Sequence, residues 1–173
     1  LGHEDNKNLV VPKLVDFFKG QNISYVACGA DFTAVIANKK LYTFGDGQSG
    51  NLGHGNEDDQ PIPKQVIFGG TDVTHVACGR DHMAVIADGP LYTCGDGQYG
   101  QLGHDNDDDL NTLQKVASLT GPVTHVACGV SHTAVIIDDQ LYTFGRNNYG
   151  QLGLGHFFNT NLPTQVESFK GKI

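Results

Sequence analysis

Histidines and cysteines recur in this sequence at a spacing that zinc sites use. His75, Cys78 and His82 are separated by two and three residues, and residues 125–132 repeat the arrangement. Zn²⁺ is held by such side chains when they converge on one point. In a strand, however, side chains alternate between faces, so His75 and Cys78 point to opposite sides. The corresponding segment 25–32 carries tyrosine and phenylalanine at the histidine positions. We therefore expect packing roles and no metal site.

Two glycine-rich segments, Gly45–Gly50 and Gly95–Gly100, match the G-x-G-x-x-G pattern of phosphate-binding loops. Each follows an expected strand, but no helix follows whose N-terminus could hold a pyrophosphate. The third copy of the segment has Asn147 in place of the second glycine. Glycine and asparagine both suit turns with positive φ. We interpret these segments as turns and expect no nucleotide cofactor.

Acidic residues gather in the loops that follow each Leu-Gly motif. A calcium loop of the EF-hand type starting at Asp105 would need glycine and glutamate where Leu110 and Val116 stand. The last copy of the loop carries Phe157 and Phe158 instead of acids. These loops are candidates for binding a protein partner, and the alternative is that their charges only keep the surface soluble. Nine of the 19 acidic residues lie in them: Glu4, Asp5, Glu57, Asp58, Asp59, Asp105, Asp107, Asp108 and Asp109.

The sequence offers no motif for nucleophilic catalysis. It has no G-x-S-x-G segment, which would place a serine on a sharp strand-to-helix turn. Its cysteines form no C-x-x-C pair and lie in apolar, strand-like segments, at Cys28, Cys78, Cys94 and Cys128. Isolated thiols fit a reducing compartment. We expect a protein without enzymatic activity or cofactors that acts inside the cell, in the cytoplasm or the nucleus.

The charge balance restricts the classes of partner. Among 173 residues, 11 are Lys or Arg and 19 are Asp or Glu, which gives a net charge of −8. Phosphate backbones are bound by clustered basic residues, so direct nucleic-acid binding is not expected. No apolar run reaches the roughly 18 residues of a membrane span, and no signal-peptide pattern is recognisable at the start. The excess of acid favours a basic protein partner.

An internal repeat of 50 residues positions these candidate residues. A Val-Ala-Cys-Gly motif occurs at 26–29, 76–79 and 126–129. A Leu-Tyr-Thr-Phe/Cys-Gly motif occurs at 41–45, 91–95 and 141–145. The opening Leu1-Gly2-His3 aligns with 52–54, so the sequence enters the pattern partway through a unit. The predicted units are 1–22, which is partial, 23–72, 73–122 and 123–173.

Each unit predicts four short strands. In the first full unit, residues 24–28, 33–37 and 41–44 are rich in β-branched and aromatic side chains, and a fourth strand is expected around 64–66. The strands are nearly all apolar, as expected when neighbours cover both faces of a sheet. The pattern predicts an all-β fold, namely a β-propeller of four-stranded blades. Here it would be a partial arc of about three blades plus an orphan strand near Val11.

The repeats resemble the regulator of chromosome condensation family. The hallmark of that family runs V-A-x-G-x-x-H-T-A, then L-Y-x-(F/W)-G-x-N-x-x-G-Q-L-G-x-G, and ends with P-x-x-V. Residues 126–155 follow it closely, and Pro163 and Val166 supply the ending. The first unit departs from it at Phe32, where histidine is expected. The segment 42–47, Tyr-Thr-Phe-Gly-Asp-Gly, also resembles the retinitis pigmentosa GTPase regulator branch of the family.

This resemblance implies a ring of seven blades, which at this repeat length needs about 350 residues. The remaining blades are expected from a longer parent chain or from other chains. The resemblance implies a protein–protein interaction module with a link to small-GTPase regulation. The alternative is a guanine-nucleotide exchange factor for a Ran-like small GTPase. The retinitis pigmentosa branch adds the cilium as a further compartment.

Overall fold

The fold consists of three four-stranded antiparallel sheets, as predicted. The computed structural model describes residues 1–3 and 8–169. Sheet 1 contains β1 (Ile23–Cys28), β2 (Phe32–Ala37), β3 (Lys40–Gly45) and β4 (Gln60–Gln65). Sheet 2 contains β5 (Val73–Cys78), β6 (His82–Ala87), β7 (Leu91–Gly95) and β8 (Leu110–Lys115). Sheet 3 contains β9 (Val123–Cys128), β10 (His132–Ile137), β11 (Gln140–Gly145) and β12 (Thr160–Gln165).

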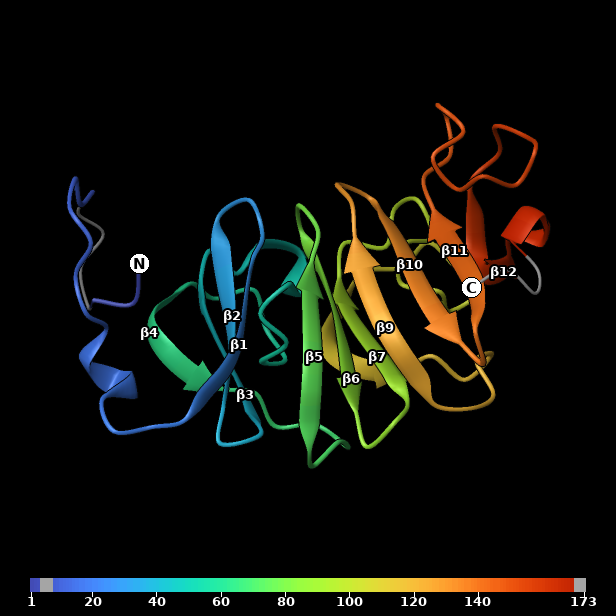
Figure 1. The fold of residues 1–173 in the computed structure, drawn as a ribbon. Helices are drawn as coiled ribbons and strands as arrows, with labels where there is room; N and C mark the ends of the chain where they lie inside the picture. The colour runs from blue at the N-terminus through green and yellow to red at the C-terminus, as the bar shows by residue number, and fades with distance from the viewer. Residues whose placement is uncertain (4–7, 170–173) are drawn as a thin grey trace.

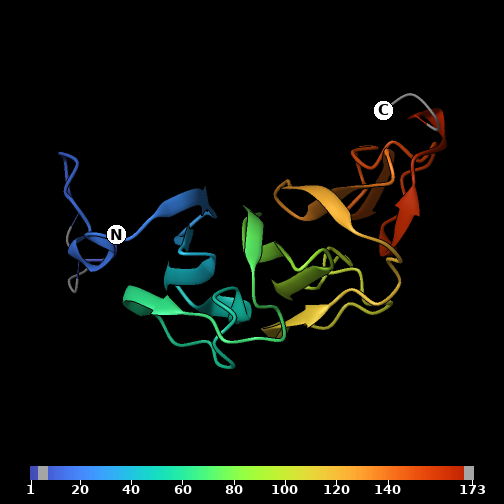
Figure 2. The ribbon, with the colours of Figure 1, turned by 60° about the horizontal axis from the view of Figure 1, so that its bottom comes forward.

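The sheets follow one another along an arc in the order of the sequence (Figures 1 and 2). The first strands of the sheets, β1, β5 and β9, lie side by side at the front of Figure 1, whereas β4, β8 and β12 form the opposite edge. The N-terminal segment and the C-terminal segment lie at opposite ends of the arc. Within the described residues, helical structure is limited to three single 3₁₀ turns, η1 (Asp16–Phe18), η2 (Gln48–Gly50) and η3 (Glu167–Phe169). None of the helices in the described ranges has the length that crossing a membrane would take.

The hydrophobic core lies between successive sheets. One cluster joins sheets 1 and 2 and includes Ile36, Leu41, Val76 and Met83. In β6, which has a neighbouring sheet on each face, every residue is buried. In β10 buried and half-buried residues alternate, because only the face toward sheet 2 is covered. A strand whose two faces are both covered needs apolar residues at nearly every position, as in β6, rather than at every second one.

The orphan strand expected near Val11 does not form. The first strand in the described residues is β1, which starts at Ile23. A strand needs a neighbour for its backbone hydrogen bonds, and this sequence holds no third strand of the same unit to provide one. Instead, the η1 turn places Phe18 against Val35 and Phe44 on the outer face of sheet 1. The segment is therefore retained by side-chain packing rather than by strand pairing.

Candidate protein-interaction rim

In each sheet, two loops pack together at one rim. The turn after the third strand lies against the loop that precedes the fourth strand. The backbone N–H of Gly47 donates to Asp59 Oδ1 at 3.0 Å, and that of Gly97 donates to Asp109 Oδ1 at 2.8 Å. A Cβ on Gly97 would lie 2.0 Å from the backbone oxygen of Asp108, so the packing in sheet 2 leaves no room for a side chain at this position. The glycine-rich segments are turns packed on the acidic loops.

This contact assigns a structural role to two of the candidate binding residues. Asp59 and Asp109 accept hydrogen bonds from the facing turn. In the third unit the same bond, Asn147 N–H to Asn159 Oδ1, is 2.9 Å long and uses an uncharged acceptor. Hydrogen bonding rather than charge therefore explains the residue type at these positions. The asparagine at 159 was the signal in the sequence for this role, and our sequence analysis missed it.

The other candidate carboxylates of the described residues lie at the surface. Five of them are exposed: Glu57, Asp58, Asp105, Asp107 and Asp108. The ion pairs found in the described part of the chain, Lys39–Asp72 and Arg80–Asp81, leave all five without a basic partner. Glu4 and Asp5 lie outside the described residues. The structure thus brings uncompensated negative charge to the rim of sheets 1 and 2.

The rim loops are fixed across the sheet boundaries. The backbone N–H of Gly55 donates to the carbonyl of Asn111 on β8 at 2.7 Å, and Asn111 Nδ2 donates back to the Gly55 carbonyl at 3.1 Å. The backbone N–H of Asp105 likewise donates to the carbonyl of Asn161 on β12 at 3.0 Å. The rim loops of sheets 1 and 2 are therefore each held by the next sheet. The carboxylates are presented on a continuous scaffold rather than on independent loops.

Sheet 3 has a different rim. Arg146 occupies the position that Asp46 and Asp96 hold in the other two sheets. Its guanidinium carbon lies 5.1 Å from the ring centroid of Tyr99 and 5.9 Å from that of Tyr149. Phe157 and Phe158 replace the acidic pair and are 69% and 78% exposed. The phenylalanines were noted from the sequence, but Arg146 was not.

The histidines of the zinc-like segments occupy separate environments. The rings of His75 and His125 lie next to each other on β5 and β9, with centroids 6.3 Å apart, and the ring of His75 also contacts Tyr25. His82 is instead fully buried between sheets 2 and 3, with Nε2 3.0 Å from Thr133 Oγ1. Within residues 1–3 and 8–169, no three His, Cys, Asp or Glu side chains are grouped to hold a metal ion. The spacing reflects packing in two different places.

Two histidines, the buried His82 and the half-buried His54, contact threonines that hydrogen-bond to the rim turns. The Thr133 hydroxyl donates to the Gln101 carbonyl at 2.8 Å, so it must accept its second hydrogen bond from a proton on His82 Nε2. The Thr43 hydroxyl likewise donates to the Leu52 carbonyl at 2.8 Å and contacts His54 Nε2 at 3.0 Å. Burial lowers the pKa of His82 and, together with the nearby charge of Lys64, that of His54, in each case from 6.5 to about 4. Both rings are therefore neutral near pH 7.

Acidification should destabilise the fold through His82. Below pH 6.5 the unfolded chain binds a proton at this residue and the folded chain does not, so stability falls as the pH drops from 6.5 toward 4. For a folded pKa of about 4, the loss from His82 alone is about 2 kcal/mol at pH 5. Urea unfolding measured between pH 7 and 5 tests this.

Sheets 1 and 2 supply the control for this experiment. At their junction Phe32 and Met83 take the positions of His82 and Thr133. The double variant His82→Phe/Thr133→Met should therefore fold with an apolar junction and show a shallower loss of stability below pH 6.5. An unchanged pH dependence in this variant would show that His82 does not carry the effect.

Burial sets the chemistry of three of the four cysteine thiols. All four cysteines are free. Burial raises the pKa of the Cys94 and Cys78 thiols and raises that of Cys128 to about 12. A thiol held in its protonated form is a poor nucleophile. Cys78, Cys94 and Cys128 pack in the clusters between the sheets, whereas Cys28 is exposed.

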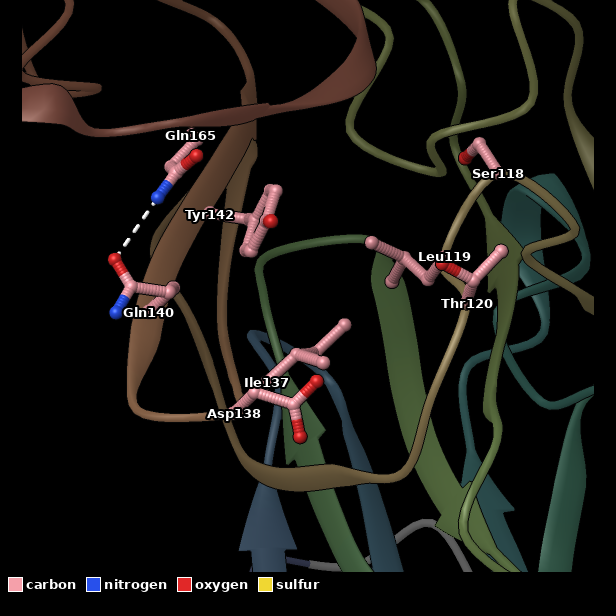
Figure 3. Close-up of a pocket in the computed structure, with 8 residues that line it drawn as sticks. All are labelled: Ser118, Leu119, Thr120, Ile137, Asp138, Gln140, Tyr142 and Gln165. Carbon is pink, nitrogen blue, oxygen red and sulfur yellow. Dashed lines mark hydrogen bonds between the residues drawn. The ribbon is translucent and has the colours of Figure 1, made fainter. Parts of the chain in front are cut away.

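A hollow lies beside sheet 3, away from the acidic loops (Figure 3). Its polar contacts include Gln165 Nε2 donating to Gln140 Oε1 at 2.9 Å. Asp138 supplies its one carboxylate, and Ser118 lies on the opposite side of the hollow in Figure 3. This lining does not bring a nucleophile and a base together. The eight lining residues are Ser118, Leu119, Thr120, Ile137, Asp138, Gln140, Tyr142 and Gln165.

Four-stranded sheets that follow one another along an arc, each with its rim loop fixed to the next, define a β-propeller repeat protein. The chain matches the regulator of chromosome condensation (RCC1) repeat over residues 1–36, 39–86, 88–136 and 138–173, and it belongs to that family. The second and third matches each begin near the third strand of one sheet and end in the second strand of the next. One repeat of the sequence therefore contributes to two neighbouring sheets.

Curated relatives match parts of the chain. It is 41% identical over 70 residues to the RCC2 homolog of Xenopus laevis, with 39% of this chain and 14% of that protein covered. It is 50% identical over 56 residues to the X-linked retinitis pigmentosa GTPase regulator of Canis lupus familiaris, with 31% and 6% covered. The human E3 ubiquitin-protein ligase HERC2 is 41% identical over 71 residues, with 38% and 2% covered. The chain thus spans 14% or less of the length of these three proteins.

Solved structures share the fold. Human WBSCR16 aligns with a TM-score of 0.75 at 30% identity, covering 84% of this chain and 40% of that one. Prp20p from Saccharomyces cerevisiae aligns with a TM-score of 0.74 at 21% identity, covering 83% and 38%. The Prp20p structure is described together with its binding to Gsp1p and histones. Both alignments cover less than half of the larger protein.

Proposed function

We propose that this chain is a non-enzymatic protein-interaction module whose acidic rim binds a basic surface of a protein partner, in connection with small-GTPase regulation. The observation that carries the proposal is a row of exposed carboxylates that form no ion pair within the described residues and are held on a scaffold continuous across sheets 1 and 2. Such a row steers basic partners and raises their association rate. The seven proposed residues are Glu57, Asp58, Asp59, Asp105, Asp107, Asp108 and Asp109, of which Asp59 and Asp109 also hold the loops in place.

Two relatives support this direction. Prp20p, which has the same fold, is described as binding histones, which are basic, and the GTPase Gsp1p. Another relative is named as a GTPase regulator. An intracellular location, in the cytoplasm, nucleus or cilium, belongs to the same proposal, and the four free thiols support it.

Further repeats of the same family are proposed to complete the arc, either in a longer parent chain or in other chains. The open face of sheet 3 supports this. Ala30 N–H donates to the Arg80 carbonyl at 3.2 Å, and Arg80 N–H donates to the Val130 carbonyl at 3.0 Å, so each sheet is hydrogen-bonded to the next at this position. The residues of β10 that face away from sheet 2, such as Ala134 and Ile136, are half-buried, whereas Ala34 and Ile36 are fully covered in sheet 1. A further blade would cover this face in the same way.

Removal of rim charge should slow association with a basic partner. In Asp107→Asn/Asp108→Asn we expect the association rate with core histones at low salt to fall several-fold, because two carboxylates leave the steering field. The difference should shrink as salt rises, since the Debye length falls to about 3 Å at 1 M. Thermal stability should stay nearly constant, because exposed charges contribute about 0.5 kcal/mol or less. Stopped-flow or surface-binding kinetics measure the rate.

A matched control removes the same number of charges elsewhere. Asp138 and Asp139 are exposed in the hairpin between β10 and β11, away from the rim loops, and both have positive φ, which asparagine tolerates. The variant Asp138→Asn/Asp139→Asn should therefore leave the association rate close to that of the parent. Equal rates for the rim variant and the parent would show that the rim only solubilises the protein.

A nucleotide-release assay distinguishes an interaction module from the second candidate function, a guanine-nucleotide exchange factor. The description of Prp20p with Gsp1p favours testing a Ran-like GTPase loaded with a fluorescent guanine nucleotide. An interaction module binds the GTPase and leaves the release rate unchanged. Accelerated release by this chain or by a longer protein that contains it would support a guanine-nucleotide exchange factor instead.

A further inference from the structure

The three sheets present equivalent rim positions with different chemistry. Each set consists of the residue that follows the glycine ending the third strand and two residues of the facing loop. In sheet 1 these are Asp46, Glu57 and Asp58, and in sheet 2 they are Asp96, Asp107 and Asp108. In sheet 3 they are Arg146, Phe157 and Phe158. Because the positions are structurally equivalent, the rim changes from acidic to cationic and aromatic at a defined place.

Contacts with two aromatic rings fix the position of the Arg146 side chain at the rim of sheet 3. Its guanidinium group lies against the rings of Tyr99 from sheet 2 and Tyr149 from sheet 3. It forms no ion pair with any residue in the described ranges, and its buried Nε atom finds no hydrogen-bond partner there. Two aromatic contacts fix the orientation of the planar group, which then loses less freedom when it binds. A guanidinium group fixed in this way is suited to pairing with a carboxylate from another molecule.

Phe157 and Phe158 stand at loop positions that stay exposed even where another sheet follows. The loops of sheets 1 and 2 are followed by another sheet, yet Glu57, Asp58, Asp107 and Asp108 remain exposed. Phe158 stands at the same position as Asp58 and Asp108 and is 78% exposed, and the ring of His156 lies beside it. Tyr149 is 83% exposed at the open end of the arc, whereas its equivalent Tyr99 is half-buried beside sheet 3. Aromatic and arginine side chains in one exposed patch are characteristic of binding hot spots.

We propose that this corner, defined by Tyr99, Arg146, Tyr149, Phe157 and Phe158, binds a segment of the partner that carries a carboxylate next to apolar side chains. This partner is the same protein whose basic surface is proposed to bind the acidic rim of sheets 1 and 2. The inference therefore rests on the proposed function for the identity of the partner. Charge complementarity determines which part of the partner binds where. The acidic rim of sheets 1 and 2 repels the partner's carboxylate, whereas Arg146 attracts it. The rim therefore binds its partner in one orientation. The aromatic corner supplies affinity, and the acidic rim supplies the rate of encounter.

Three labelled peptides test the proposal by fluorescence polarisation. The first joins four lysines to Glu-Leu-Phe-Glu through a Gly-Ser linker, the second carries only the lysines, and the third carries only Glu-Leu-Phe-Glu. Arg146→Asp, which installs the residue of the other two sheets, should weaken binding of the third peptide by about tenfold or more, which is about 1.4 kcal/mol. Phe158→Asp, which also copies sheet 2, should have a similar effect. Arg146→Lys should bind with intermediate affinity, because it keeps the charge but loses the planar stack.

Asn148→Asp is the matched control, because it adds one negative charge at an exposed neighbouring position and leaves Arg146 in place. It should weaken binding less than Arg146→Asp does, and circular dichroism melts should show all four variants folded. If the third peptide does not bind the parent, or binds Arg146→Asp equally well, the proposal is wrong. If the third peptide binds in an Arg146-dependent manner and the lysine peptide does not bind, the corner stands and the acidic-rim function fails.

Discussion

Replacing Gly100 with alanine should lower the free energy of unfolding by about 3 kcal/mol or more, from backbone strain and overpacking together. Gly100 has φ +80°, and a Cβ built there would lie 2.5 Å from the Cα of Asn161 and 2.8 Å from the carbonyl oxygen of Thr160. Both atoms belong to the backbone of β12 in the next sheet and cannot move without separating sheets 2 and 3. The loss of stability is measured by urea or guanidinium unfolding.

Gly150 offers a matched control for this substitution. It ends the same motif with φ +75°, but a Cβ there would meet only the ring of Phe157, at 3.4 Å. Gly150→Ala should therefore show the strain of the positive φ alone, about 1 kcal/mol. Equal losses for the two variants would mean that the contact with β12 does not limit this position. A larger loss at Gly100 measures the close approach between sheets.

Truncation of Phe144 to alanine should lower the free energy of unfolding by about 3 to 5 kcal/mol. Its ring is fully buried in the cluster between sheets 2 and 3, together with Ile86 and Val116. The neighbouring residue Gly103 lies so close that an added Cβ would be 2.9 Å from the ring. Because glycine has no side chain, it cannot fill the cavity that the substitution would leave. Phe158→Ala, at an exposed position, should change stability by about 0.5 kcal/mol or less. Comparable effects for both variants would show that the junction between sheets 2 and 3 does not hold the fold.

The repeat allowed the sheets to be predicted from the sequence, because each strand has the same pairing partners in every copy. The orphan strand near Val11 failed for the same reason, since its surroundings lack the pairing strand. The hydrogen bonds of Asp59 and Asp109 span 12 residues between two loops, and a reading by charge alone could not show them. The stacking of Arg146 on Tyr99 joins residues of two different sheets. Only the three-dimensional arrangement reveals such a contact.

The difference between β6 and β10 has a consequence for the order in which this protein opens. A protein made of stacked repeats is stabilised mainly by contacts between neighbours, so a unit with two neighbours gains about twice as much as a unit with one. Sheet 2 is covered on both faces, whereas sheet 3 is covered on one. Amide hydrogen exchange should thus be slowest in β6 and faster in β10, with the arc fraying from its ends inward. Binding of a further blade to sheet 3 would slow exchange in β10 and convert a fraying end into an interior unit.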